Sequence, residues 1–151
     1  EELEKKLSEA RSKKPSKKIL KLAYLGVPPI MNDLYSYIEE RGAKVVFNEV
    51  QREFAFPRHA KAKNIFEQYL NYTYPYGIEF RIKNLEKDLA DRDVQGIIHY
   101  TQKFCHRALD NIVLKEKLPY PLLNIEADRE SVLDERTKLR LDAFIDMLGD
   151  M

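Results

Sequence analysis

Residues 96–130, GIIHYTQKFCHRALDNIVLKEKLPYPLLNIEADRE, contain a strand, a helix and a second strand in succession. The apolar run 94–100 predicts a buried strand, residues 103–116 have helical spacing, and residues 121–125 predict the next strand. This succession is typical of a parallel sheet with right-handed crossovers. Cys105, the only cysteine, follows the first of these strands, where α/β sheets usually present their chemistry.

The same alternation of strands and helices continues on both sides of this stretch. Strands are predicted at residues 18–25 and 44–50, and helices near 31–41, 65–70, 78–89 and 131–148. Gly42 lies where a helix C-terminal cap is expected, and Ser131, with Asp134 three residues on, is the expected N-cap of the last helix. We therefore predict a three-layer α/β sandwich of the Rossmann or flavodoxin-like type, with a parallel sheet of about four strands and helices on both faces.

The opening segment EELEKKLSEARSKKPSKK is highly charged and has few apolar positions. Leu3 and Leu7 lie four residues apart, which permits a short, solvated helix. We interpret residues 1–17 as a charged linker or lead-in helix, and residues 18–151 as the C-terminal α/β domain of a longer subunit.

Composition excludes several classes of protein. The 26 basic and 25 acidic residues give a net charge of +1, whereas a nucleic-acid-binding domain is expected to be basic. One cysteine cannot form an internal disulfide, which favours a reducing compartment. The chain has no apolar run of about 18 residues and no signal peptide. We expect a cytoplasmic protein without nucleic-acid or membrane partners.

Polar residues gather in the loops expected after the strands. The segment LGVPPI follows the first strand in place of a glycine-rich phosphate loop, which argues against a nucleotide-binding domain. Such loops are polar in most α/β proteins, so loop position alone also has a purely structural explanation. The candidate site residues at this edge are Glu49, Gln51, His99, Gln102 and Glu126.

Cys105 is the strongest single candidate. With Thr101 as N-cap, the thiol would lie in the first turn of a helix, where the helix dipole favours a thiolate. A thiolate serves as a nucleophile or as an iron or zinc ligand, although a lone cysteine is more often a small buried hydrophobe. A nucleophile would need His99 or His106 as a base, and a metal would need ligands from elsewhere.

Several segments together resemble one family. They are LAYLGVPPIMNDLYSYIEERGAKVVFNEVQREFAFP, YLNYTYPYG and residues 96–148, in the same order along the chain. Over residues 18–148 the chain resembles the C-terminal domain of the 2-hydroxyacyl-CoA dehydratase family, the group of the 2-hydroxyglutaryl-CoA dehydratase D-component. Benzoyl-CoA reductase subunits and double-cubane-cluster proteins belong to the same family.

The resemblance implies an oxygen-sensitive [4Fe–4S] cluster held by cysteines from several domains, with Cys105 as one ligand. It implies an ATP-hydrolysing activator that injects an electron, an acyl-CoA substrate that forms a ketyl radical and loses water, and a second homologous subunit. The remaining ligands would lie in upstream domains, so we expect the isolated chain to fold without iron and to be inactive.

Alternative functions remain open at this point. A double-cubane-cluster ATP-dependent reductase or a benzoyl-CoA reductase-like subunit differs in cysteines outside this chain. A non-catalytic domain could instead dock another subunit through its edge loops and the aromatic segment 72–80. A Cys–His hydrolase lacks a supporting motif.

Overall fold

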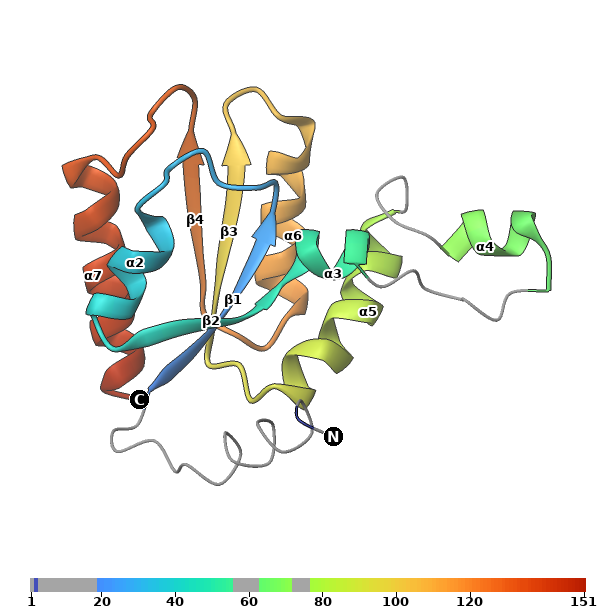
Figure 1. Cartoon of the computed structure of the whole chain (residues 1–151), viewed down its shortest axis with the longest axis horizontal. Helices are drawn as coiled ribbons and strands as arrows, with labels where there is room; N and C mark the ends of the chain where they lie inside the picture. Colours follow the sequence, from blue (N-terminus) through green and yellow to red (C-terminus); the bar gives the residue numbers. More distant parts are fainter. Residues whose placement is uncertain (1, 3–18, 56–62, 72–76) are drawn as a thin grey trace.

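The computed structural model describes residues 2, 19–55, 63–71 and 77–151. Within them, four parallel strands form one sheet in the order β2-β1-β3-β4 (Figure 1). The predicted α/β fold is therefore confirmed, while the expected lead-in helix and Tyr72, Tyr74 and Tyr76 lie outside the described residues. The strands are β1 (Leu20–Gly26), β2 (Ala43–Asn48), β3 (Gly96–Gln102) and β4 (Leu122–Ala127).

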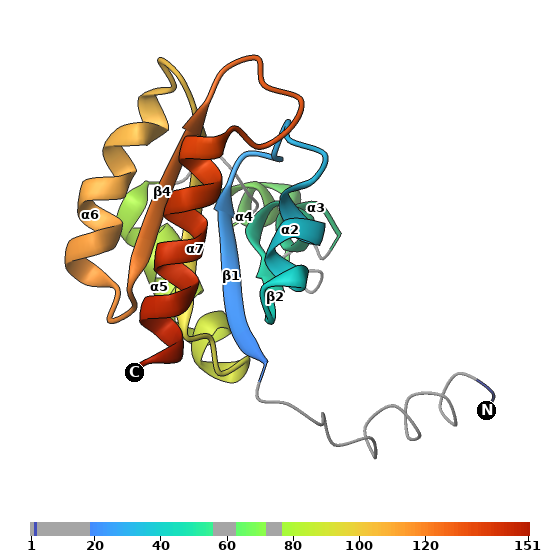
Figure 2. The ribbon, with the colours of Figure 1, turned by 90° about the vertical axis from the view of Figure 1, so that its left-hand side faces the viewer.

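Alternation of side chains along β1 divides the core into two halves. Leu22 and Tyr24 pack with the helices on one face, and Ala23 and Leu25 pack with the helices on the other. Because both faces are buried, β1 is apolar at every one of these positions. Figure 2 views the face covered by α2 and α7. The covering helices are α2 (Leu34–Glu40) and α7 (Glu135–Gly149) on one face, and α5 (Ile78–Asp91) and α6 (Asp110–Lys117) on the other.

The second strand is shorter than predicted. It ends at Asn48, and the helix α3 (Glu49–Ala55) begins at the next residue. The Asn48 side-chain oxygen accepts a hydrogen bond from the Gln51 backbone N–H at 3.1 Å, as an N-terminal cap does. Glu49 therefore lies in the first turn of a helix rather than in a loop. The predicted helix at 65–70 is confirmed as α4 (Ile65–Asn71).

The segment after β3 also differs from the prediction. Thr101 belongs to β3 and does not cap a helix. The chain turns at residues 102–105 and forms a short 3-10 helix, η1 (His106–Leu109), before α6 begins at Asp110. The reason is that the parallel pairing of β3 with β4 extends to Gln102, so the backbone stays extended beyond Thr101.

Of the two predicted helix caps, one is confirmed and the other is wrong. Gly42 adopts a φ of +77° after α2, as a C-terminal cap requires. The N-cap of α7 is Asp134 and not Ser131, because the Asp134 carboxylate accepts a hydrogen bond from the Thr137 N–H at 2.7 Å. Asp33, which precedes α2, accepts a hydrogen bond from the Leu133 N–H at 2.8 Å. This bond links the N-terminal ends of α2 and α7.

The sheet order determines where a ligand can enter. From β1 the chain moves outward to β2 and then returns to the other side of β1 to form β3. The topological switch point therefore lies between the carboxyl ends of β1 and β3, and ligands of open α/β sheets bind at such points. Among the described helices, none combines the length and apolar character that a membrane crossing requires.

Candidate functional site

A cavity of about 180 Å³ lies at the switch point, between the ends of β1 and β3. It brings together residues from both strands, from α3 and α5, from the turn before η1 and from η1 itself. The wall is formed by Gly26, Val27, Glu49, Arg81, His99, Tyr100, Thr101, Cys105, His106 and Arg107.

Gly26 permits the close approach of the two strands at this point. Its φ is +100°, a conformation that side chains rarely adopt. A β-carbon at this position would overlap the backbone carbonyl oxygen of Tyr100 and would lie 3.4 Å from Cδ2 of His99. The absence of a side chain therefore keeps this end of β1 against β3 and leaves one edge of the His99 ring facing Gly26.

A buried ion-pair network forms the floor of the site. Arg81 donates from Nε and Nη2 to the two carboxylate oxygens of Glu49, at 2.7 Å each. It also donates from Nη1 to Asp110 at 2.8 Å. Arg81 and Glu49 are each only 3% exposed, so this bidentate pairing compensates for the loss of water around both charges.

Glu49 also connects this network to the sheet. Its Oε2 accepts a hydrogen bond from the Gly26 backbone N–H at 3.0 Å, at the end of β1. One carboxylate thus links α3, β1 and α5, and Asp110 extends the network to α6. Four elements of the fold are held in register around the cavity by these contacts.

His99 is a buried, neutral imidazole. Its Nδ1 lies 3.3 Å from the side-chain oxygen of Asn111, and a hydrogen bond between these two atoms requires the ring proton on Nδ1. Burial, and secondarily the nearby positive charge of Arg81, lowers the pKa of His99 from 6.5 to about 4. Its Nε2 is buried and has no hydrogen-bond partner among the described residues.

Cys105 lies in the wall of the cavity and is half-buried. Its N–H donates to the Gln102 carbonyl oxygen at 3.1 Å, and its own carbonyl oxygen accepts from the Ala108 N–H at 2.9 Å. Phe104, the residue before Cys105 in this turn, has a φ of +62° and is fully exposed. The thiol is therefore positioned by a tight turn, and not by the first turn of an α-helix as predicted.

The structure separates the candidate residues into two groups. Glu49, His99 and Cys105 share the cavity wall. The other three, Gln51, Gln102 and Glu126, are exposed and lie outside it. A parallel strand presents alternate residues to opposite sides, so position near a strand end does not decide which side chains meet.

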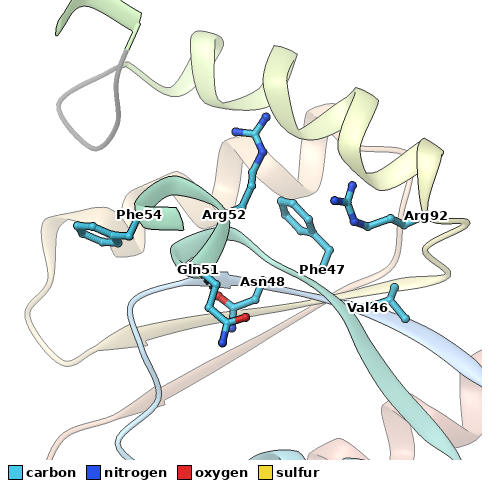
Figure 3. A pocket seen from close by; sticks show the side chains of 7 residues that line it. All are labelled: Val46, Phe47, Asn48, Gln51, Arg52, Phe54 and Arg92. Atoms are coloured by element: carbon cyan, nitrogen blue, oxygen red, sulfur yellow. Dashed lines mark hydrogen bonds between the residues drawn. The ribbon is translucent and has the colours of Figure 1, made fainter. Parts of the chain in front are cut away.

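Gln51 lines a larger hollow of about 590 Å³ beside the edge strand β2. Figure 3 shows Phe47 between the two arginines of this hollow, with Gln51 and Asn48 directed away from them. Arg52 pairs through Nε with Asp88 at 2.7 Å, and the Arg92 guanidinium lies 5.2 Å from the centre of the Phe47 ring. The hollow is more open than the switch-point cavity, and both guanidinium groups already have partners, so we place the site at the switch point.

Sequence reasoning missed three residues of the site, Arg81, Asp110 and Asn111. For Arg81 a signal was present, because it lies three residues after Ile78 and four before Leu85, on the apolar face of α5. A charged residue on such a face is buried only if a partner neutralises it. The partner, Glu49, is 32 positions away and could not be identified without the fold.

The donor set can be compared with the needs of an iron–sulfur cluster. Such a cluster needs three or four thiolates, and the chain contains only one cysteine. In the part of the chain that the structure describes, no three His, Cys, Asp or Glu side chains converge to hold a metal ion. A cluster at this site would need Cys105 as one ligand and further thiolates from outside this chain.

The similarity of this chain to known proteins lies at the level of the family. No curated protein matches the chain significantly. The family model described as 2-hydroxyglutaryl-CoA dehydratase, D-component, matches residues 1–148 of the 151. The chain therefore belongs to the family of the 2-hydroxyglutaryl-CoA dehydratase D-component.

Proposed function

We propose that this chain is the part of a 2-hydroxyacyl-CoA dehydratase component that supplies Cys105 as one thiolate ligand of a [4Fe–4S] cluster. Family membership supports the dehydratase assignment. The observation that carries the cluster assignment is the position of the one thiol in the wall of the switch-point cavity, where no group of three metal-binding side chains converges among the described residues. A shared cluster requires such an isolated ligand at an edge that other domains can reach.

When bound, the cluster would supply the low-potential electron needed to remove water from a 2-hydroxyacyl-CoA. The residues of this chain have simpler roles. The Gln102–Cys105 turn holds the thiol, and the Glu49–Arg81 pair keeps the wall beneath it rigid. His99 adds no positive charge at neutral pH, because its pKa is about 4.

This function requires several partners. We propose that upstream domains of the same subunit supply further cluster ligands, that a homologous subunit completes the active site, and that an ATP-hydrolysing activator delivers the electron. A double-cubane reductase or benzoyl-CoA reductase-like subunit would use Cys105 in the same way. The identity of the upstream ligands distinguishes these enzymes.

A docking function has one specific observation in its favour. Phe104 is fully exposed and adopts a left-handed backbone conformation, although it is a large apolar residue beside the proposed ligand. Leu109, five residues on, is 70% exposed. In a non-catalytic subunit, this apolar pair would contact the neighbouring subunit, and Cys105 would have no role in binding iron.

Anaerobic iron and sulfide analysis with EPR spectroscopy tests the proposal on the full-length protein. We expect Cys105→Ser to lose the cluster signal while the circular dichroism spectrum stays unchanged. Phe104→Ala is the matched control at the adjacent position and is expected to retain the cluster. An intact cluster in Cys105→Ser, with subunit assembly lost in Phe104→Ala, would establish the docking function instead.

A further inference from the structure

We propose that His99 and Thr101 form a recognition pocket for the hydroxyl group of a short 2-hydroxyacyl chain, in the cavity at the β1–β3 switch point. The identity of the acyl chain rests on the proposed function. The recognition of a hydroxyl group rests on the cavity itself.

The first observation is a pair of unused polar atoms. His99 is fully buried and Thr101 is 2% exposed, and both line the cavity. Neither Nε2 of His99 nor Oγ1 of Thr101 has a hydrogen-bond partner among the described residues. A buried polar atom without a partner costs about 1–3 kcal/mol, so two in one cavity indicate a missing ligand or water.

The direction of the His99 ring supports the same conclusion. Nδ1 faces Asn111 on α6, at 3.3 Å. The opposite ring edge, which carries Cδ2 and Nε2, faces Gly26, another residue of the cavity wall. Nε2 is bonded to Cδ2 in this edge of the ring, and in the tautomer with the proton on Nδ1 it can only accept a hydrogen bond.

The two atoms together select a hydroxyl group. His99 and Thr101 lie two positions apart on β3 and thus on the same face of the strand. Same-face neighbours are about 7 Å apart, so one small ligand can reach both. Nε2 needs a donor, whereas the Thr101 hydroxyl can donate, and a ligand hydroxyl can satisfy both because it donates and accepts.

The remaining wall favours a short, uncharged chain. The charges of Glu49 and Arg81 are already matched to each other, at 2.7 Å, and Arg107 of the same wall pairs with Asp110 at 3.3 Å, so these groups do not call for a charged ligand. Val27 and Tyr100 add apolar surface. A water molecule occupies about 30 Å³ in the liquid, so the cavity volume of about 180 Å³ accommodates a hydroxyl group with a few carbon atoms.

The test compares two neutral amides that differ only in the hydroxyl group, 2-hydroxybutyramide and butyramide. Both are titrated into the 151-residue chain without iron, and binding is followed by NMR through the ¹⁵N signals of the His99 ring. We expect about tenfold tighter binding of the hydroxy amide, which corresponds to one well-placed hydrogen bond. We also expect an upfield shift of the Nε2 signal with this ligand only.

Two variants separate recognition from folding. His99→Phe removes the acceptor, and Thr101→Val removes the hydroxyl at nearly constant volume. Each is expected to reduce the preference for the hydroxy amide to about threefold or less, with butyramide affinity unchanged. Backbone amide signals of Val46 and Phe47 report any binding in the separate hollow beside β2.

Equal affinity for the two amides, shifts confined to the β2 hollow, or an unchanged preference in both variants would overturn the inference. The outcome is independent of the cluster test. Loss of the cluster in Cys105→Ser without a hydroxyl preference leaves the proposed function intact and removes the pocket. A hydroxyl preference together with an intact cluster in Cys105→Ser would support the pocket and refute the role of Cys105 as a cluster ligand.

Discussion

The substitution Arg81→Met tests the buried ion-pair network most directly. Methionine keeps most of the side-chain volume but removes the guanidinium that neutralises Glu49, which is 3% exposed and 2.7 Å away. Leaving one member of a buried ion pair uncompensated typically costs about 3–5 kcal/mol. A domain of this size has a total stability of roughly 5–15 kcal/mol, so the variant should remain folded but be markedly weaker.

Urea denaturation followed by circular dichroism measures this change in the free energy of unfolding. A loss of about 3–5 kcal/mol should also lower Tm by roughly 6–20 °C. The double variant Glu49→Gln with Arg81→Met should be no less stable than Arg81→Met alone, because it removes the stranded carboxylate charge.

The control is Asp93→Asn, which removes an ion pair at the surface. The Lys21–Asp93 pair has a separation of 3.0 Å, but the two side chains are 42% and 84% exposed. Asparagine tolerates the φ of +52° at this position, so only the ion pair changes. We expect a cost within about 1 kcal/mol. A similarly small cost for Arg81→Met would refute the argument that burial makes the Glu49–Arg81 pair structurally necessary.

Three further predictions concern the pH dependence, the glycines and the helix caps. The pKa of His99 falls from 6.5 in the unfolded chain to about 4 in the folded one. The folded state therefore keeps its full free energy of unfolding, as far as His99 is concerned, above pH 6.5. This free energy should decrease by roughly 3 kcal/mol as the pH falls to 4. Urea titrations at pH 7.5 and 4.5 should show a smaller decrease in His99→Phe, and an equal decrease would contradict the assignment. Gly42→Ala, at a positive φ with open space around it, should cost about 1 kcal/mol. Gly26→Ala, where a β-carbon meets backbone of β3, should cost about 3 kcal/mol or more in the same assay. Asp134→Ala should lower stability by about 1 kcal/mol through loss of the α7 cap. Ser131→Ala should change stability by less than about 0.5 kcal/mol. A larger loss of stability in Ser131→Ala than in Asp134→Ala would identify Ser131 as the cap.

Local patterns were sufficient for most of the fold. The apolar run at residues 22–25 helped to predict a strand at residues 18–25, and such a run suits a central parallel strand, which is buried on both faces. The 3-to-4 spacing of Ile78, Ile82, Leu85 and Leu89 predicted α5 for a similar reason. These patterns are properties of neighbouring residues, so they can be read without knowledge of the fold.

Element ends were less predictable because they depend on competing contacts. Residues 44–50 have the composition of one strand, yet the Asn48 side chain caps α3 and ends β2 two residues early. Thr101 is a good N-cap residue by type, but its pairing in the sheet with β4 keeps it extended. In both places the sequence pattern allowed two local structures, and a hydrogen bond decided between them.

By itself, the sequence determined that the chain is a parallel α/β domain with its single thiol just after the third strand. It also indicated the family, through segments shared along most of its length. Only the tertiary structure decided which side chains meet that thiol. The order β2-β1-β3-β4 places Gly26 against His99 and brings Glu49 to Arg81, residues far apart in the chain. Charge neutralisation and burial depend on such long-range contacts, which cannot be derived from residue type and spacing alone.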